Sequence, residues 1–212
     1  FDKSISNKFK NDLKIKYPYC LMPQKEDFTF KLSSGVMILS KYPLELIKHV
    51  VFDVSKKSDK GAQKGCSLVK ININNKAIFL AGTHLDSKNN NSRSLQYQIT
   101  NDEILKPYLN DSIPLLIAGD FNTDFKSSQY DSMMTSFKLK NFELNDDRPY
   151  TFDEFNTWND KRYKAWIDFI FFQENKNIKV FNQYILRPVM KYKNAKMDLA
   201  DHYQIVIEAV IY

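Results

Sequence analysis

Apolar residues follow one another along this chain in short runs, each about as long as one β-strand. Runs that are rich in β-branched and aromatic residues, and bounded by polar or turn-forming residues, predict strands. They lie at 36–39, 50–54, 67–73, 77–81, 114–119, 167–172 and 203–211. Asn74 and Asn75 separate two of these runs and predict a hairpin turn. The pattern therefore predicts a protein in which strands predominate.

Apolar residues spaced three or four positions apart predict three helices. The first covers residues 4–17, with an apolar residue at every fourth position, and Pro18 stops it. The second covers residues 92–109, and the third covers residues 127–140. The inner side of the second helix is expected to consist of Leu95, Ile99, Leu105 and Leu109.

Adjacent strand pairs separated by a few helices predict a layered α/β sandwich with mixed sheets. No repeat, low-complexity tract or linker interrupts the sequence, so residues 1–212 are expected to form a single domain. Hydrophobic residues make up 43% of the 212 residues and charged residues 26%, which excludes intrinsic disorder as the main state. The longest apolar runs are strand-sized, which excludes a membrane-spanning helix of about 20 residues.

Positive charge is concentrated in the first third of the chain. The net charge is +6, and residues 1–70 contain 14 lysines against seven acidic residues. This indicates either an anionic partner, such as nucleic acid or a lipid surface, or a solvated lysine face. The chain has only four arginines, which disfavours sequence-specific DNA recognition. Two cysteines, Cys20 and Cys66, are too few for a disulfide framework or a zinc cluster. They can form at most one disulfide bridge, and the sequence does not decide whether they do.

Polar residues occupy positions at strand ends, or inside an apolar strand, that apolar packing does not explain. They lie in the segments GTHLD, GDFNTD, WIDFIFF and ADHY. The six residues are His84, Asp120, Asn122, Asp168, Asp201 and His202. Strand ends and the loops that follow them often carry functional groups in layered folds. These six residues are therefore the candidates for a functional site.

Asp168 is flanked by apolar residues on both sides, where an ionised carboxylate is costly unless it is paired. A buried imidazole would satisfy the carboxylate; hydrogen bonds to backbone amides are the structural alternative. Asp120 and Asn122 are two positions apart, so at an extended strand end both side chains face the same side. A carboxylate and an amide oxygen on one side suit a hard divalent cation.

Six motifs occur in a characteristic order: SGVMILSKYP, KGCSLVKI, GTHLDS, GDFNTD, WIDFIFF and LADHYQIV. From about residue 17 to the C-terminus the chain resembles the metal-dependent endonuclease/exonuclease/phosphatase superfamily. Within it, the chain is most similar to the neutral sphingomyelinase (sphingomyelin phosphodiesterase) branch. The run Tyr150-Thr151-Phe152-Asp153 ahead of Asn156 belongs to this similarity. The resemblance implies a DNase I-like, four-layer α/β (α+β) sandwich of two mixed, mainly antiparallel sheets packed face to face, with helices outside.

The resemblance also implies roles for the candidate residues. His202 matches the general base that deprotonates a water for in-line attack on phosphorus, and Asp201 matches a residue that helps to orient it or the metal. His84 matches a histidine that donates to phosphate oxygens, and Asp168 matches the carboxylate partner of that histidine. Phosphoryl transfer depends mainly on positioning and charge stabilisation, which this set of groups provides.

Asp120, Asn122 and Asp201 are the metal ligands that the resemblance implies, for Mg²⁺ or another divalent cation such as Mn²⁺ or Co²⁺. Asn122 and His84 match groups that contact the substrate phosphate. Lys64 and Gly65 match a Lys-Gly element near the phosphate, with an exposed loop lysine as the alternative interpretation. Ser40 and Arg93 also match family positions and are interpreted as structural.

The chain departs from the family pattern in two places. The family's principal metal ligand, a glutamate in a Gln-Glu pair, and an asparagine on the first strand have no match here. We therefore expect a domain that lacks the family's N-terminal strands, binds metal weakly and has little or no turnover. The bacterial members' exposed aromatic pair, on a hairpin before Asp-His, is replaced by Val189 and Met190, which are less suited to a membrane interface.

Three functions remain open from the sequence. The first is hydrolysis of sphingomyelin to ceramide and phosphocholine, the second is a metal-dependent nuclease on the same scaffold, and the third is an inactive binding module. The corresponding partners are a phospholipid at a membrane surface or nucleic acid, with a monomer expected. The compartment stays open, with a secreted or a peripheral membrane protein favoured.

Overall fold

The computed structural model describes residues 3–24, 32–53, 61–144, 146–160 and 162–212. The helices are α1 (Lys3–Leu13), α2 (Asn90–Thr100), the π-helical turn η2 (Asn101–Leu105) and α3 (Ser128–Phe137). The strands are β1 (Tyr19–Leu21), β2 (Ile38–Ser40), β3 (Leu44–Val51), β4 (Gly65–Ile73), β5 (Lys76–His84), β6 (Leu115–Asp120), β7 (Lys140–Asn141), β8 (Asp168–Phe172), β9 (Ile178–Leu186), β10 (Val189–Tyr192), β11 (Ala195–Asp198) and β12 (Gln204–Ile211).

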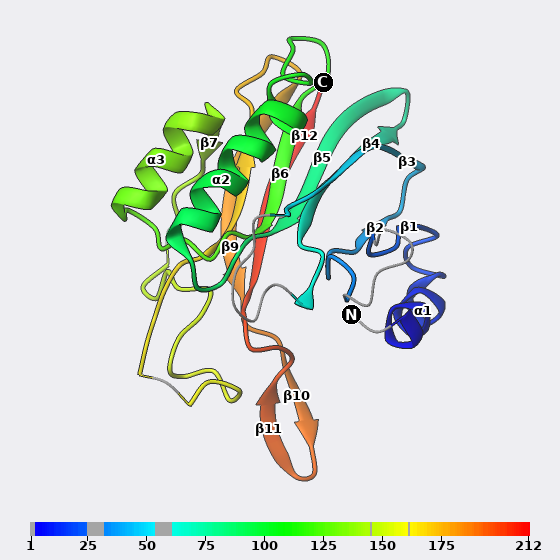
Figure 1. Ribbon diagram of the computed structural model, residues 1–212. Coiled ribbons are helices and arrows are strands. Elements are labelled where there is room, and N and C mark those ends of the chain that lie inside the picture. The colour runs from blue at the N-terminus through cyan, green and yellow to red at the C-terminus, as the bar shows by residue number, and fades with distance from the viewer. Residues whose placement is uncertain (1–2, 25–31, 54–60, 145, 161) are drawn as a thin grey trace.

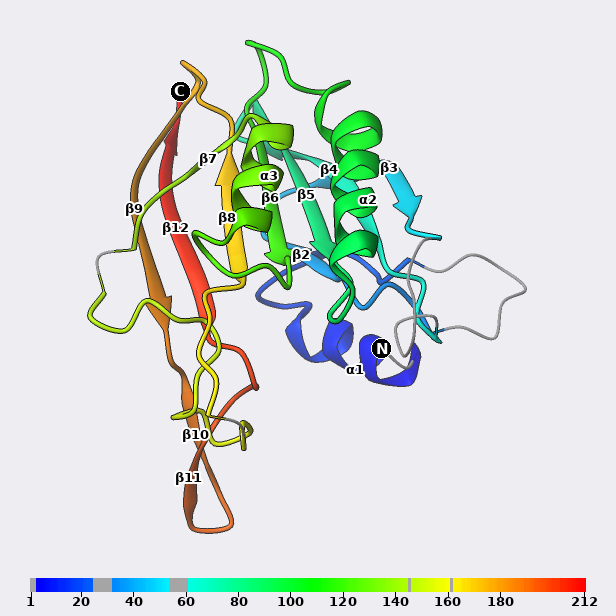
Figure 2. The same cartoon turned by 60° about the vertical axis from the view of Figure 1, so that its left-hand side comes forward.

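A six-stranded sheet with the order β3-β4-β5-β6-β8-β7 forms the centre of the molecule. Only the β5–β6 pair is parallel, and the other pairs in this sheet are antiparallel. Helices α2 and α3 cover one face, and the antiparallel pair β9–β12 lies on the other side (Figures 1 and 2). The predicted layered sandwich of mixed sheets is therefore confirmed.

Alternate side chains of β4 enter two separate cores, as the period of a strand requires. Cys66 and Leu68 join the large core beneath α2 and α3, and Val69 and Ile71 pack against β1 and β2. The large core is strongly aromatic. The ring of Phe121 lies edge-on to those of Phe137, Phe169 and Phe171. Burial of these rings holds β6, β8 and α3 together and fixes the strand ends that carry the candidate residues.

The turn between β4 and β5 has the geometry that its sequence predicts. Asn74 and Asn75 both adopt positive φ angles, 46° and 67°. Two consecutive positive φ angles are typical of the type I′ turn, whose twist matches that of the flanking strands. Asparagine tolerates this conformation better than most residues, which is why the pair sets the register of the hairpin.

Several sequence-based predictions of helix faces and boundaries are wrong. The first helix is Lys3–Leu13 rather than 4–17, and its apolar residues Ile5 and Phe9 are 48% and 49% exposed. Leu95, predicted to face the core from α2, is 46% exposed. The strand predicted at 50–54 begins at Leu44 and ends at Val51, and residue 54 lies outside the described residues. The apolar pattern did not predict strands β1, β7, β9, β10 and β11.

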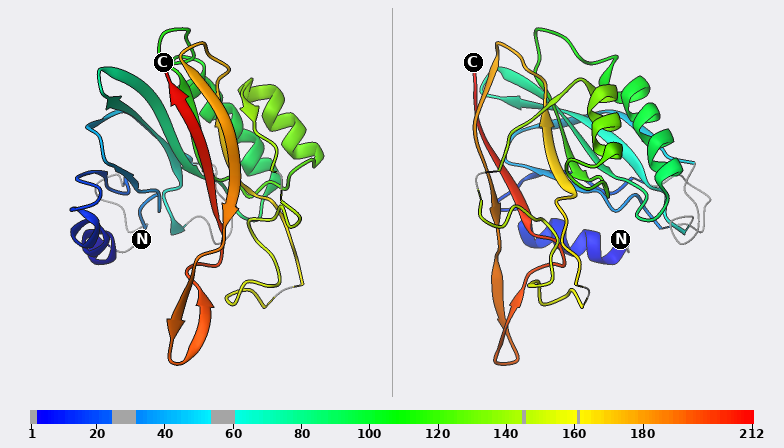
Figure 3. Two further views of the ribbon diagram at one scale, coloured as in Figure 1. Left: turned by 180° about the vertical axis from the view of Figure 1, so that it is seen from behind. Right: turned by 90° about the vertical axis from the view of Figure 1, so that its left-hand side faces the viewer.

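The hairpin β10–β11 projects from the body of the molecule, beyond the ends of β9 and β12 (Figures 1 and 3). Val189, Met190 and Tyr192 are exposed on it. Its turn residues Lys193 and Asn194 have positive φ angles, as in the β4–β5 turn. Among the helices in the described part of the chain, none is long and apolar enough to cross a membrane.

The two cysteines do not form the disulfide bridge that the sequence left open. Both are free thiols, with Cys66 buried in the large core and Cys20 partly accessible on β1. Burial raises the pKa of Cys66 to about 12, so its reactive thiolate is scarce at neutral pH. Burial also raises the pKa of Cys20, by the same mechanism in a less enclosed position.

We expect one thiol of the native protein to react with a chromogenic disulfide reagent at pH 8, and both to react after unfolding in urea. The reacting residue is Cys20, because reagent and solvent do not reach Cys66. The Cys20→Ser variant is the control, and it is expected to show no reaction in the native state. Reaction of both thiols in the native protein at equal rates would contradict the burial of Cys66.

Candidate active site

The register of the central sheet places three candidate residues side by side. His84, the last residue of β5, is opposite Asp120 on the parallel strand β6. Asp120 is in turn opposite Asp168, the first residue of β8, across an antiparallel pair. Paired residues on neighbouring strands project to the same face of a sheet. These three side chains therefore form one row across the edge of the sheet.

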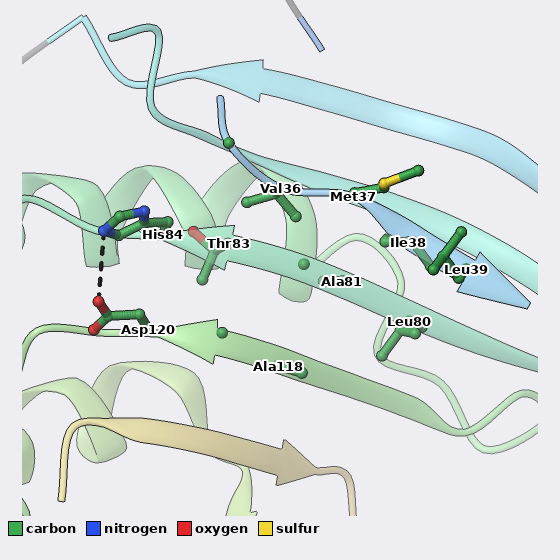
Figure 4. A pocket seen from close by; sticks show the side chains of 13 residues that line it. Val36, Met37, Ile38, Leu39, Leu80, Ala81, Thr83, His84, Ala118 and Asp120 are labelled. Atoms are coloured by element: carbon green, nitrogen blue, oxygen red, sulfur yellow. Dashed lines mark ion pairs between the residues drawn. The ribbon is translucent and has the colours of Figure 1, made fainter. Parts of the chain in front are cut away.

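His202 completes the cluster from the loop between β11 and β12. Its Nδ1 lies 2.9 Å from Oδ2 of Asp168. The expected pairing of Asp168 with His84 is therefore wrong, because Asp168 pairs with His202. His84 lies instead beside Asp120, with its Nε2 3.5 Å from Oδ2 (Figure 4). Strand order explains which carboxylate each histidine meets, because β6 with Asp120 lies between β5 with His84 and β8 with Asp168.

Asn122 is held close to Asp120 by a tight turn after β6. Asn122 has a φ of 49°, and its backbone N–H donates to Oδ1 of Asp120 at 2.8 Å. Its side-chain amide donates to Oδ2 of Asp120 and to the carbonyl of Leu85, both at 3.1 Å. The side chain is thus oriented by two acceptors, and its donors are directed at the carboxylate and at the end of β5.

A glycine allows β6 to approach β5 closely just before Asp120. Gly119 has a φ of 155°, a conformation that side-chain-bearing residues rarely adopt. A Cβ atom at this position would lie 1.9 Å from the carbonyl oxygen of Thr83 on β5. The glycine in GDFN therefore permits the strand pairing that puts Asp120 next to His84.

Burial and like charges shape the protonation of the cluster. Burial raises the pKa of Asp120 to about 7, and the nearby charge of Asp168 adds to this rise. Burial alone would lower the pKa of His202, but the hydrogen bond and charge of Asp168, followed by the charges of Asp120 and Asp201, raise it to about 9. The carboxylates of the cluster therefore repel one another and favour the protonated form of His202.

Three of these residues are arranged so that they could hold a metal ion. Asp120, Asp168 and His202 each offer a ligand atom, and the three atoms lie within 4.8 Å of one another. The raised pKa of Asp120 fits this interpretation, because a cation would relieve the repulsion from Asp168. Asp201, expected as a ligand, is exposed beside His202 and lies outside this group. Asn122 contacts Asp120 directly.

Lys64 is buried, with only 5% of its surface exposed, so the alternative of an exposed loop lysine is wrong. Its Nζ donates to the carbonyl of Leu85 at 2.6 Å, and its charge lowers the pKa of Asp120. Gly65 begins β4 and is packed against Val50, whose carbonyl oxygen would lie 2.3 Å from an added Cβ. The lysine thus brings a positive charge to the side of the cluster where β5 ends.

Ser40 and Arg93 are buried and hydrogen-bonded within the protein, as their structural interpretation predicts. The Ser40 hydroxyl accepts from the backbone of Tyr42, and the Arg93 guanidinium donates to the carbonyl of Asp86 at 2.8 Å. Phe152 was not assigned a role from the sequence, yet its ring lies edge-on to that of His202 with centroids 5.2 Å apart. The sequence feature that could have identified Phe152 as a site residue is its place in the run Tyr150-Thr151-Phe152-Asp153.

A groove of about 480 Å³ opens next to His84 and Asp120 (Figure 4). Strands β5 and β6 line it on one side, and residues 35–39 line it on the other. Val36, Ile38 and Leu80 make most of this lining apolar. The polar pair thus lies at one end of an apolar groove.

The comparisons with known proteins agree on one family. The model of the Endonuclease/Exonuclease/phosphatase family matches residues 4–202. Sphingomyelinase C 2 of Leptospira interrogans is 28% identical over 159 residues, covering 66% of this chain and 26% of that protein. A phospholipase C of Staphylococcus aureus is 28% identical over 167 residues, covering 69% of this chain and 49% of that protein. The chain therefore spans about half or less of the length of these relatives.

Solved structures share the fold at lower identity. A variant of the beta toxin from Staphylococcus aureus, crystallised with bound magnesium ions, superposes with a TM-score of 0.79 at 19% identity. The match covers 100% of this chain and 83% of that one. At this identity the likeness establishes the fold, and the chemistry of the site must be argued from the residues themselves.

Proposed function

The chain belongs to the Endonuclease/Exonuclease/phosphatase family, and we propose that it is a Mg²⁺-dependent phosphodiesterase that hydrolyses sphingomyelin to ceramide and phosphocholine. The single observation that carries the proposal is the His202–Asp168 pair next to Asp120. An oriented imidazole beside a carboxylate cluster is suited to activating water near a phosphate. The sphingomyelinase and phospholipase names of the relatives support the choice of substrate.

His202 acts as the general base. Its Nδ1 donates to Asp168, which leaves the lone pair of Nε2 free to accept a proton from the attacking water. The carboxylate fixes the tautomer and then stabilises the imidazolium that forms. Positive charge brought next to the carboxylates of Asp120 and Asp168 would lower the pKa of His202 from about 9 towards the range in which a base works at neutral pH.

His84 orients the phosphate, and Asn122 holds Asp120 beside it. Both lie on the Asp120 side of the row, so an attacking water near His202 would have the phosphate between it and His84. The N–H of His84 and the ammonium of Lys64 can stabilise the negative charge that grows on the phosphoryl oxygens. The interactions that Asp120 and Leu85 already make with Asn122 reduce the cost of orienting it during the reaction.

Asp120 is the carboxylate best placed to hold the cation, with Asp168 and His202 nearby. When bound, a divalent cation supplies positive charge at the phosphate and the leaving group. The two carboxylates meet the preference of Mg²⁺ for hard oxygen ligands. Asn122 and Asp201 lie on the two loops that border this group and are proposed to complete it directly or through water.

A nuclease on the same scaffold is the second candidate. The observation that favours it is the lysine-rich first third of the chain, since phosphate backbones attract clustered positive charge. Both substrates present a phosphate diester to the same groups. They differ in what surrounds the diester: an extended polyanion for a nuclease, and a lipid surface for a sphingomyelinase.

We expect the full-length protein to release phosphocholine from sphingomyelin vesicles in the presence of Mg²⁺, and to leave supercoiled plasmid DNA intact under the same conditions. Chelation with EDTA is expected to reduce the rate by at least about 10²-fold, because phosphoryl transfer relies on electrostatic stabilisation, and excess Mg²⁺ is expected to restore it. Phosphocholine release is measured with a coupled choline oxidase assay.

Cleavage of plasmid DNA without phosphocholine release would replace the proposed function by the nuclease. Hydrolysis of neither substrate would overturn both. Phosphocholine release that survives EDTA would contradict the proposed cation dependence, whereas the fold would be unaffected. His202→Gln is the matched control for each substrate, because it removes the general base and keeps a side chain of similar size and polarity.

A further inference from the structure

The segment before β8 contains a threonine, Thr151, that hydrogen-bonds to the backbone of Asp168 and to the backbone of Tyr203, the residue after His202. Thr151 is fully buried. Its backbone N–H donates to the carbonyl of Ala165 at 3.0 Å, which ties it to the segment that leads into β8. The threonine is thus fixed to the sheet by its own main chain.

The hydroxyl group of Thr151 binds the start of β8. Its Oγ1 accepts from the backbone N–H of Ile167 and from that of Asp168, both at 3.1 Å. These two N–H groups lie at the point where the polypeptide turns into the strand, and Asp168 is the residue that carries the carboxylate. The hydroxyl therefore holds the backbone from which the carboxylate projects.

The carbonyl group of Thr151 binds the loop that carries the histidine. It accepts from the backbone N–H of Tyr203 at 2.7 Å, one residue after His202. The same segment holds Tyr203 a second time, because the Tyr203 hydroxyl donates to Oδ1 of the buried Asp153 at 3.0 Å. One short segment thus determines where the residue next to the histidine lies.

From these contacts we propose that Thr151 is a positioning residue that sets the distance between the His202 imidazole and the Asp168 carboxylate. The inference rests on the proposed function, because its catalytic consequence requires His202 to be the general base. Asp168 begins β8 of the central sheet, and His202 lies 34 positions later in the loop before β12. Thr151 bonds directly to the backbone of Asp168 and to that of Tyr203, which adjoins His202, and so couples the positions of the two side chains.

The hydroxyl is the part of Thr151 that a substitution can remove without changing shape. Valine has nearly the same volume but cannot accept the two N–H groups, which would then be buried without a partner. Serine keeps the acceptor and loses only a methyl group. The pair Thr151→Val and Thr151→Ser therefore separates the hydrogen bonds from the packing. Thr100→Val is the matched control, since Thr100 is buried on α2, away from the site.

We expect Thr151→Val to lower kcat of the full-length protein by about 10²-fold, the cost of a misplaced catalytic group, with KM unchanged. Thr151→Ser is expected to restore most of the rate, and Thr100→Val to retain it. The substrate is bis(p-nitrophenyl) phosphate with Mg²⁺, which reports on diester hydrolysis without requiring a lipid surface. A structural role alone would lower the amount of folded enzyme and leave kcat per folded molecule unchanged.

A second readout does not depend on activity. The imidazole Nδ1 proton shared with Asp168 should give a strongly deshielded ¹H NMR signal, assigned by its absence in His202→Gln. We expect this signal to be lost or displaced in Thr151→Val and retained in Thr151→Ser and Thr100→Val. If Thr151→Val does not fold, Thr151→Cys replaces it, because its sulfur is only a weak acceptor.

Wild-type kcat and an unaltered proton signal in the folded valine variant would overturn the proposal. So would an equal loss of rate in the serine variant, because that would assign the effect to packing. If the unsubstituted protein hydrolyses no diester, the proposed function fails. The NMR comparison then still decides whether Thr151 holds the pair together.

Discussion

Asp168→Asn is expected to lower kcat of the full-length protein on sphingomyelin by about 10³-fold, within the range reported for general-base catalysis. The effect should fall on kcat rather than on KM, because Asp168 orients the base and leaves the contacts to the substrate unchanged. Rates are measured as phosphocholine release at saturating sphingomyelin and Mg²⁺. The substitution exchanges a single heavy atom, a carboxylate oxygen for an amide nitrogen.

The physical reason is the tautomer of His202. The Asp168 carboxylate can only accept at Nδ1, so the proton stays on Nδ1 and Nε2 stays available as a base. An asparagine can instead present its amide N–H to Nδ1, which favours the tautomer that carries its proton on Nε2. The substitution also removes the negative charge that stabilises the imidazolium. Both effects act on the proton transfer itself.

Asp131→Asn is the matched control, because Asp131 is exposed on α3 and the chemical change is identical. It should retain the unsubstituted rate. Near-normal activity of Asp168→Asn would show that His202 is not the base, even if the protein is a phosphodiesterase. Circular dichroism and the urea midpoint of each variant show whether the fold has been preserved.

Gly119→Ala is expected to lower the free energy of unfolding by about 3 kcal/mol or more, from backbone strain and a steric clash together. Alanine is disfavoured at a φ of 155°, and its Cβ would lie 1.9 Å from the carbonyl oxygen of Thr83. The clash is with backbone in the β5–β6 ladder, which cannot rotate away as a side chain could. A loss of this size is a large part of the 5–15 kcal/mol that stabilises a typical domain.

Gly61→Ala is the control, since an added Cβ at Gly61 meets no atom of the described residues within 4 Å. It is expected to change the unfolding free energy by no more than about 0.5 kcal/mol, as for ordinary surface substitutions. Urea titration followed by tryptophan fluorescence measures both variants against the unsubstituted protein. Equal stabilities for the two glycine variants would contradict the close approach of β5 and β6.

The strands and the identity of the candidate residues could be predicted because both are local properties. The apolar runs of β4, β5, β6, β8 and β12 are visible without any knowledge of their partners. Asp168 stands out because a carboxylate inside an apolar strand requires a partner wherever that strand lies. The Asn74–Asn75 turn is equally local, because the two asparagines themselves tolerate the positive φ angles that the hairpin requires.

The buried faces of helices, and strands that combine polar and apolar residues, were harder to predict from the sequence. The burial of a side chain depends on which other elements pack against it. Leu95 has helical periodicity like its neighbours, yet none of the described elements packs over it closely enough to bury it. Strands β9, β10 and β11 mix lysine, asparagine and glutamine with apolar residues. Such sequences have no clear period, and cross-strand pairing stabilises them instead.

The sequence by itself therefore determined which chemical groups gather at strand ends, because residue type and local periodicity are written in the chain. Only the tertiary structure decided which imidazole faces which carboxylate. That pairing follows from strand order, since β6 separates β5 from β8 and leaves Asp168 to His202. Strand order depends on contacts between residues far apart in the sequence. The energies of these contacts depend on how entire faces of sheets and helices pack together, and a short sequence motif does not contain that information.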